Sequence, residues 1–176
     1  MEYQIIKPKN KDSDQSSTQV EEPKWTLEEV ALPSSTLNDV DEMLAYISNK
    51  GKLLHDWEFE RFLKTGKGLS INFFGLPGTG KSITADAVAQ RLGTTIVRAN
   101  YGELESELMG GTAKNLLSVF DVATKSNSVL FFDEADSLLS RRVSNLSQAA
   151  DYGINATKST MLTLMDKFDG VLILID

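Results

Sequence analysis

The segment Gly75–Ser82 constrains this chain more than any other, because its residues read Gly-Leu-Pro-Gly-Thr-Gly-Lys-Ser. This is the pattern G-x-x-x-x-G-K-[ST], and it stands between the apolar stretch Ile71–Phe74 and the alanine-rich stretch Lys81–Leu92. The glycines permit a backbone path that turns successive N–H groups inward as an anion-binding nest. A helix that starts at the end of such a loop adds unpaired N–H donors and the positive end of its dipole. The pattern therefore predicts a phosphate-binding loop between a strand and a helix.

The residue types in this loop have distinct predicted roles. The Lys81 ammonium can reach the β- and γ-phosphates of a nucleotide, and the Ser82 hydroxyl can ligate Mg²⁺. The alternative is an ordinary glycine-rich turn before a helix, which a match to the whole pattern in this context disfavours. The residues predicted to bind the nucleotide are Gly75, Pro77, Gly78, Thr79, Gly80, Lys81, Ser82 and Ile83.

A second motif carries two adjacent carboxylates, Asp133 and Glu134, directly after the apolar residues 129–132. That run places Asp133 at the carboxyl end of a buried strand, where ligands bind in open α/β sheets. Asp133 is therefore expected to hold Mg²⁺ together with Ser82, and Glu134 is expected to polarise an attacking water molecule. Glu134 and Lys81 are the predicted catalytic residues. The alternative is that these acids only cap a following helix at Asp136, but the phosphate loop upstream makes the joint pattern more specific.

The remaining chain alternates between apolar strands and amphipathic helices. We expect strands at 71–74, 94–98, 129–132 and 171–175, and helices at 35–51, 53–63, 81–92, 113–123 and 157–168. This alternation predicts an α/β fold in which helices cover both faces of a parallel sheet. Residues 1–24 are polar enough to form a flexible N-terminal tail, residues 25–68 form a helical lead-in, and residues 69–176 form the core.

Composition excludes several classes of protein. The chain has no cysteine, which removes disulfide frameworks and thiolate zinc sites, and it has one histidine, His55. Its net charge of −7 has the wrong sign for a protein whose main task is to cover nucleic-acid phosphates. No apolar run approaches the length that spans a bilayer, and the N-terminus lacks the features of a signal peptide. These observations predict a cytoplasmic protein with no membrane partner, and they disfavour nucleic acid as its partner without excluding a local basic groove.

The combination of Gly75–Ser82, the run Asp133–Leu138 (Asp-Glu-Ala-Asp-Ser-Leu) and the pair Arg141-Arg142 resembles the AAA+ ATPases. It looks most like the bacterial branch related to protein-remodelling and microtubule-severing AAA proteins. The resemblance runs from about Trp25 to Asp176. It implies a P-loop NTPase three-layer sandwich, namely the large subdomain of the AAA+ module. It also implies binding of ATP, ADP and Mg²⁺, ATP hydrolysis, and a homo-hexameric ring that remodels an unidentified protein substrate.

The resemblance also suggests roles for residues outside the two motifs. Leu108 and Met109 stand where the family carries a central pore loop, although Leu108 replaces a common aromatic residue and an ordinary loop explains the segment equally well. In the family an arginine at the position of Arg141 or Arg142 tends to lie near the subunit interface, and the alternative is a solvated helix end. Val30 and Leu32 correspond to residues that line the adenine pocket.

Three further residues have structural interpretations. His55 is expected to be a packed or surface histidine rather than a catalyst, because phosphoryl transfer here requires no imidazole. Trp25 and Trp57 are expected to be core or interface anchors.

The apolar run Val171–Ile175 resembles the fourth core strand of the family, and the sequence ends at Asp176. The family's polar sensor, fifth strand, arginine fingers and helical lid all come later in the chain. We therefore expect a core truncated after the fourth strand, with the unpaired edge of the first strand exposed, and a chain that is a fragment or an early-ended product.

Other functional classes share parts of this pattern. A truncated, non-hydrolysing nucleotide-binding module would account for the missing sensor and fingers. A DNA-directed AAA+ protein is disfavoured by the acidic charge and by the lack of a basic, aromatic-rich patch. The letters Asp-Glu-Ala-Asp also occur in RNA helicases, but 176 residues leave no room for the second recA-like domain that those proteins need.

Overall fold

The computed structural model describes residues 19–58, 61, 67–100, 112–135 and 149–175. Its centre is a five-stranded sheet in the order β1-β3-β4-β5-β2. The strands are β1 (Gln19–Glu21), β2 (Leu69–Phe73), β3 (Ile96–Asn100), β4 (Val129–Asp133) and β5 (Val171–Ile175). Strands β2 to β5 run parallel to one another, and β1 pairs with the outer side of β3 in the antiparallel sense. The predicted parallel α/β architecture is therefore confirmed.

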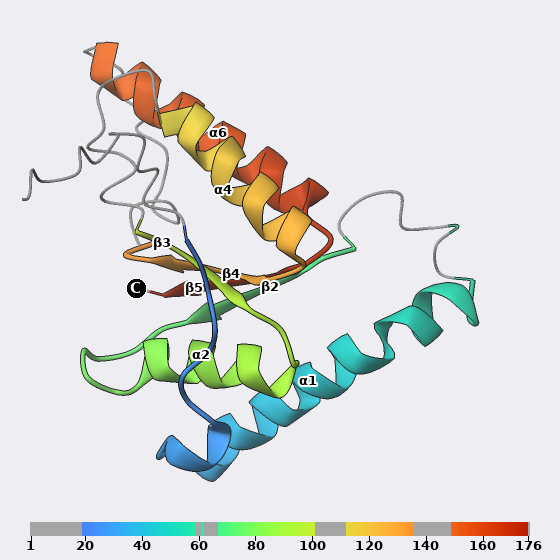
Figure 1. The fold of residues 1–176 in the computed structure, drawn as a ribbon. Coiled ribbons are helices and arrows are strands. Elements are labelled where there is room, and N and C mark those ends of the chain that lie inside the picture. The colour runs from blue at the N-terminus through green and yellow to red at the C-terminus, as the bar shows by residue number, and fades with distance from the viewer. Residues whose placement is uncertain (1–18, 59–60, 62–66, 101–111, 136–148, 176) are drawn as a thin grey trace, which may run out of the picture.

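Helices cover both faces of this sheet, giving three layers (Figure 1). On one face lie α1 (Ser34–His55) and α2 (Lys81–Arg91), and on the other lie α4 (Thr112–Ser126) and α6 (Ala149–Lys167). A short 3-10 helix, η1 (Leu27–Glu29), precedes α1 and contacts α2. From β2 onward, strands and helices alternate along the chain as the sequence predicts.

The hydrophobic core has two parts, one on each face of the sheet. Side chains on β4 and β5 alternate between them, so Phe131 and Ile173 face α1 and α2, while Phe132 faces α4 and α6. On the α4 face the Phe120 ring lies 5.9 Å from that of Phe132, centroid to centroid. Because each fully buried large apolar side chain contributes about 1.5–3 kcal/mol, this double core fixes the positions of the strand ends.

The two edge strands of the sheet test the prediction of an exposed first core strand and the prediction of a flexible tail. Among the described strands, β2 pairs with β5 alone and ends the sheet, as expected for the first core strand. Gln19–Glu21 departs from the flexible tail expected over residues 1–24, because it forms β1 against the other edge. The composition of this segment gave no sign of a strand, since the residues that pair with it lie on β3, far away in the sequence. The boundaries predicted after residues 24 and 68 stay predictions.

The lead-in helix differs from its prediction. Gly51 was expected to separate two helices, but α1 runs without a break from Ser34 to His55. It then ends, and Glu58 has a φ of 57°, so the helix predicted over 53–63 is wrong at residues 56–58. A glycine inside an exposed helix costs only about 1 kcal/mol relative to alanine, which neighbouring turns can offset.

This continuity predicts that Gly51→Ala stabilises the protein by about 0.5–1 kcal/mol, because an added Cβ at that position meets open space and alanine favours a helix. The thermal midpoint measured by circular dichroism should rise by a few degrees. Gly68→Ala serves as the contrast, since its Cβ would overlap the Phe168 carbonyl oxygen and lower the midpoint. A lower midpoint for Gly51→Ala would show that the helix does break there.

Candidate nucleotide-binding site

The predicted phosphate-binding loop, Gly75–Ser82, is called here the phosphate loop. It connects β2 to α2 and has the backbone that the pattern predicts. Gly75, Gly78 and Gly80 have φ values of 146°, 79° and 90°, a region that side chains disfavour. Gly80 is the left-handed residue directly before α2, so the helix begins at Lys81 with its first N–H groups facing the loop. Inside the loop, the Thr79 hydroxyl donates to the Leu76 carbonyl oxygen at 2.8 Å. The loop is exposed from Gly75 to Thr79, which leaves its concave side accessible.

The Lys81 ammonium lies within this loop. Its Nζ donates to the Gly75 carbonyl oxygen at 2.5 Å and lies 3.3 Å from that of Leu76. The start of α2 is held by Thr84, whose backbone N–H and hydroxyl both donate to the Gly80 carbonyl oxygen at 2.8 Å. Lysine, loop amides and helix N-terminus therefore concentrate positive charge at one point, which suits a polyphosphate.

The two predicted carboxylates stand at the carboxyl ends of the parallel strands, which is the end of the sheet where the loop begins. Phe132 pairs with Leu174 of β5, and Phe73 pairs with Ile175, so Asp133 and Phe73 lie at one level with β5 between them. Two strand spacings make their backbones about 10 Å apart. Figure 1 shows the loop between β2 and α2 on the side where β5 ends.

Glu134 has an unusual backbone at this edge. Its φ is 56°, a left-handed value rare for a residue with a side chain, and its N–H donates to Asp133 Oδ1 at 2.9 Å. Directly after it, the Ala135 N–H donates to the Ile175 carbonyl oxygen at 2.8 Å and ties the turn to β5. The Glu134 side chain is exposed, at the end of the sheet where a ligand on the loop would lie.

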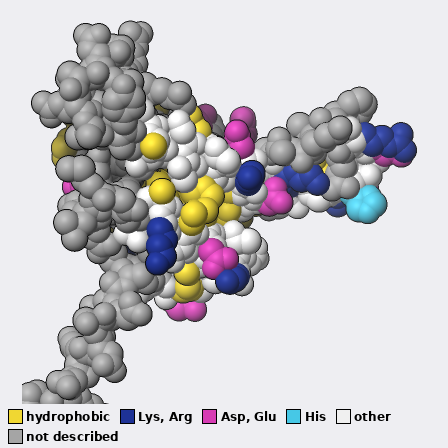
Figure 2. All heavy atoms as spheres, turned by 90° about the horizontal axis from the view of Figure 1, so that it is seen from above, with side chains coloured by type: hydrophobic (Ala, Val, Ile, Leu, Met, Phe, Trp, Pro, Cys, Tyr) yellow, Lys and Arg dark blue, Asp and Glu magenta, His cyan; other side chains and the backbone are white. Residues whose placement is uncertain are grey.

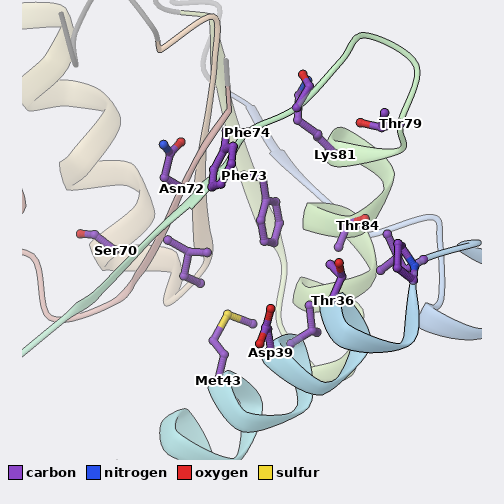
Figure 3. Close-up of a pocket in the computed structure, with 15 residues that line it drawn as sticks. Thr36, Asp39, Met43, Ser70, Asn72, Phe73, Phe74, Thr79, Lys81 and Thr84 are labelled. Atoms are coloured by element: carbon purple, nitrogen blue, oxygen red, sulfur yellow. The ribbon is translucent and has the colours of Figure 1, made fainter.

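A cavity of about 680 Å³ extends from the phosphate loop along β2 to α1 (Figure 3). Gly75, Thr79 and Lys81 line it at the loop end, and Figure 3 shows Met43 and Asp39 at the α1 end with Phe73 between. Its walls combine apolar and polar side chains, and its size suits a small molecule. The other lining residues are Leu32, Pro33, Thr36, Val40, Ser70, Ile71, Asn72, Phe74 and Thr84.

Residues 19–33, called here the N-terminal strap, run from β1 to the start of α1 and reach this cavity. Val30 is half-buried, and its Cγ1 lies 3.7 Å from the position of a Cβ added to Gly80. Leu32 is also half-buried and lines the cavity itself. The strap therefore brings Val30 to the phosphate loop and Leu32 to the space beside it.

The donors at this edge fit Mg²⁺ in the form in which it accompanies a nucleotide. Among the described residues no group of three or more His, Asp or Glu side chains can hold a metal ion. Ser82 and Asp133 offer one hydroxyl and one carboxylate oxygen, and Mg²⁺ usually binds one or two such protein ligands together with substrate phosphates and water. The site therefore fits a cation that arrives with a polyphosphate.

A comparison with known families agrees with this geometry. The ATPase family associated with various cellular activities (AAA) matches residues 71–175. The chain belongs to the AAA family of ATPases. The match covers the phosphate loop, both carboxylates, the strands β3, β4 and β5 and most of β2, so the predicted family and fold class are confirmed.

Individual relatives of this AAA core come from archaea and yeast. The proteasome-activating nucleotidase of Methanosarcina mazei is 38% identical over 115 residues, which cover 62% of this chain and 27% of that protein. The nucleotidase of Methanococcus maripaludis is 30% identical over 167 residues, or 93% of this chain and 39% of that protein. The 26S proteasome regulatory subunit 7 homolog of Schizosaccharomyces pombe is 36% identical over 116 residues, or 63% of this chain and 25% of that protein. The chain thus spans less than two fifths of the length of these curated relatives. Its place in a bacterial branch stays a prediction.

Several predicted residues of the AAA core lie away from the site or outside the described residues. Leu108, Met109, Arg141 and Arg142 fall outside, so their pore-loop and interface roles stay predictions. His55 is exposed at the end of α1 and is the cyan side chain in Figure 2. In the described residues no helix is long and apolar enough to cross a bilayer.

The two tryptophans correct one expectation. Trp25 is 43% exposed and Trp57 is 67% exposed, so neither is a core anchor of this chain. Their role as interface anchors stays a prediction.

Asp86 in the middle of α2 is 1% exposed and belongs to neither sequence motif. The available signal was a single carboxylate in the stretch Thr84–Ala89, where the other side chains are threonine, alanine or valine. A buried charge needs partners, and those partners come from β3 and the strap, which no local pattern reveals.

Proposed function

We propose that this chain binds Mg·ATP on Gly75–Ser82 and, as part of a longer protein, hydrolyses ATP to drive remodelling of a protein substrate. One observation supports this above all. A loop with three glycines at positive φ encloses the Lys81 ammonium, and the carboxylates Asp133 and Glu134 share its edge of the sheet. Family membership supports the choice of ATP, since the family is one of ATPases.

In this proposal each residue has a separate task during binding. The loop amides and the N-terminus of α2 hold the phosphates, and Lys81 exchanges the Gly75 carbonyl oxygen for the β- and γ-phosphate oxygens. Ser82 and Asp133 hold Mg²⁺, which when bound neutralises charge on the phosphate oxygens. Val30 and Leu32 contact the nucleobase from the strap.

The proposed chemical step depends on Glu134. Its carboxylate orients a water molecule and accepts a proton as the water oxygen bonds to the γ-phosphorus. The bond from that phosphorus to the bridging oxygen breaks, which yields ADP and inorganic phosphate. Lys81 stays on the phosphate oxygens throughout and stabilises the charge that they share.

For the substrate we propose only a class, namely proteins, and for the assembly only a type, namely a ring. Relatives named as proteasome-activating nucleotidases support a protein substrate, and we propose a homo-hexameric ring for the full-length protein. The net charge of −7 supports a protein substrate over DNA. The cytoplasmic location stays a prediction.

Calorimetric titration of the folded chain with Mg·ATP tests the binding proposal. We expect a saturable site, and Asp133→Asn should weaken the affinity measured with Mg²⁺ by about tenfold, or about 1.4 kcal/mol, because an amide oxygen is a poorer ligand for Mg²⁺. Affinity measured in EDTA should change much less. The matched control is Asp166→Asn, an exposed carboxylate on α6. Absence of Mg·ATP binding to folded chain would refute the proposed function.

A further inference from the structure

Asp86 is a buried charge that the proposed chemistry does not use. It lies on α2 between Ala85 and Ala87, both fully buried. Its Oδ2 accepts the backbone N–H groups of Lys24 at 2.5 Å and Trp25 at 2.9 Å. Among the described residues three donors converge on this carboxylate, since its Oδ1 also accepts from a guanidinium on β3.

That guanidinium belongs to Arg98, which extends the network to the start of the strap. Arg98 donates from Nη2 to Asp86 and from Nε to Glu21 Oε2 at 3.3 Å. Its guanidinium also lies over the Phe131 ring, 5.3 Å from the centroid. Residue 98 pairs with Gln19 in the ladder between β3 and β1. The strap is thereby fixed at β1 through Arg98 and again at residues 24 and 25 through Asp86, and the ion pair between these two side chains joins the two attachment points.

The second attachment point lies directly before the part of the strap that reaches the site. After Trp25 the chain forms η1, where the Thr26 N–H donates to Glu29 Oε2 at 2.9 Å, and η1 contacts α2. The next residue is Val30, beside Gly80, and Leu32 follows in the cavity wall. Asp86 lies on the helix that begins at the phosphate loop. The same helix therefore carries Lys81 at its start and the anchor of the strap in its interior.

We propose that Asp86 is a positioning residue, with Arg98 as its partner, that holds the strap at the nucleobase end of the site. This inference rests on the proposed function and adds a determinant of base affinity that itself touches no nucleotide. With the carboxylate intact, Val30 and Leu32 stand at a fixed place relative to the phosphate loop. Without it, the strap loses two backbone hydrogen bonds and Arg98 loses its buried partner.

Asp86→Asn removes this function with almost no change in volume. The asparagine oxygen can still accept a hydrogen bond, but its NH₂ group is a donor and would face donors from Lys24, Trp25 or Arg98. The phosphate loop has its own support, since Thr84 donates to Gly80 and Thr79 donates to Leu76. Loss of the anchor should therefore affect the base end of the site much more than the phosphate end.

The affinities of two ligands report on the two ends of the site separately. Mg·ATP has a base, and Mg·tripolyphosphate has none. We expect wild-type chain to bind ATP more tightly than tripolyphosphate. Asp86→Asn should weaken ATP binding about tenfold and change tripolyphosphate binding less than about twofold, so that the affinity ratio falls. The matched control is Asp121→Asn, an exposed carboxylate on α4 that pairs with Lys125 at 2.7 Å and should leave the ratio unchanged.

Arg98→Gln gives a second route to the same result, because its side chain is 30% exposed and its loss is less disruptive to folding. It should lower the affinity ratio in the same direction, and it decides the question where Asp86→Asn does not fold. An unchanged ratio in folded variants, or an equal loss for both ligands, would overturn the positioning role. Equal affinity of wild-type chain for the two ligands would also overturn it while leaving the phosphate site intact. Failure of wild-type chain to bind either ligand would instead refute the proposed function.

Discussion

Replacing Lys81 by alanine is expected to abolish measurable binding of Mg·ATP, a loss of about 100-fold or more in affinity. The Nζ of Lys81 lies inside the loop, 2.5 Å from the Gly75 carbonyl oxygen, where it can turn to the phosphates without moving the backbone. A charge-assisted hydrogen bond contributes about 1.5–3 kcal/mol, and 2.7 kcal/mol corresponds to 100-fold. Calorimetry of the folded variant provides the measurement.

The control for this variant removes a lysine that has no part in the site. Lys125→Ala deletes an exposed ammonium on α4 whose ion pair with Asp121 is a surface contact. Such pairs contribute about 0–1 kcal/mol to stability, so ATP affinity should stay at the wild-type value. If Lys81→Ala bound Mg·ATP normally while its circular dichroism spectrum matched wild type, the loop would not be the phosphate site.

Glu134→Gln is expected to keep ATP binding and to lose hydrolysis in the full-length protein. The amide can still hold a water molecule but cannot accept its proton, and general-base catalysis usually contributes 10²–10⁴-fold to a rate. We therefore expect kcat to fall by about that factor, while the dissociation constant for Mg·ATP changes less than about threefold. Steady-state phosphate release and equilibrium titration of the same preparation separate the two quantities.

Glu42→Gln is a suitable companion, because Glu42 is an exposed carboxylate on α1 and its loss should change neither quantity. Normal hydrolysis by Glu134→Gln would show that another group serves as the base. Joint loss of binding and hydrolysis would show that Glu134, with its φ of 56°, shapes the turn after β4 rather than activating water.

Most elements of the core could be predicted because their signals are local. The five apolar residues Val171–Ile175 form β5 with the predicted boundaries, and Gly93 ends α2 with a φ of 67° as a capping glycine should. The prediction of two separate lead-in helices was wrong for an equally physical reason. Gly51 is a helix breaker only on average, and the surrounding turns of α1 outweigh its small cost.

The candidate site also has parts that the local sequence predicts and parts that only the strand pairing shows. Glycine spacing and the terminal Lys-Ser specify the loop, since those residue types are what a phosphate nest requires, and the apolar run before Asp133 places it at a strand end. Sequence reasoning could not show that Asp133 and Phe73 stand level across β5, because register comes from pairing between strands distant in the chain.

By itself, then, the sequence determined the family, the phosphate loop and the two carboxylates, all of which are written in short, contiguous patterns. Only the tertiary structure decided that Gln19–Glu21 is a strand and that Asp86 anchors the strap beside the site. The strand depends on its backbone pairing with β3, which is distant in the sequence. The anchor depends on a buried carboxylate that meets donors from residues 24, 25 and 98, and burial of a charge is compensated only where the fold brings such partners together.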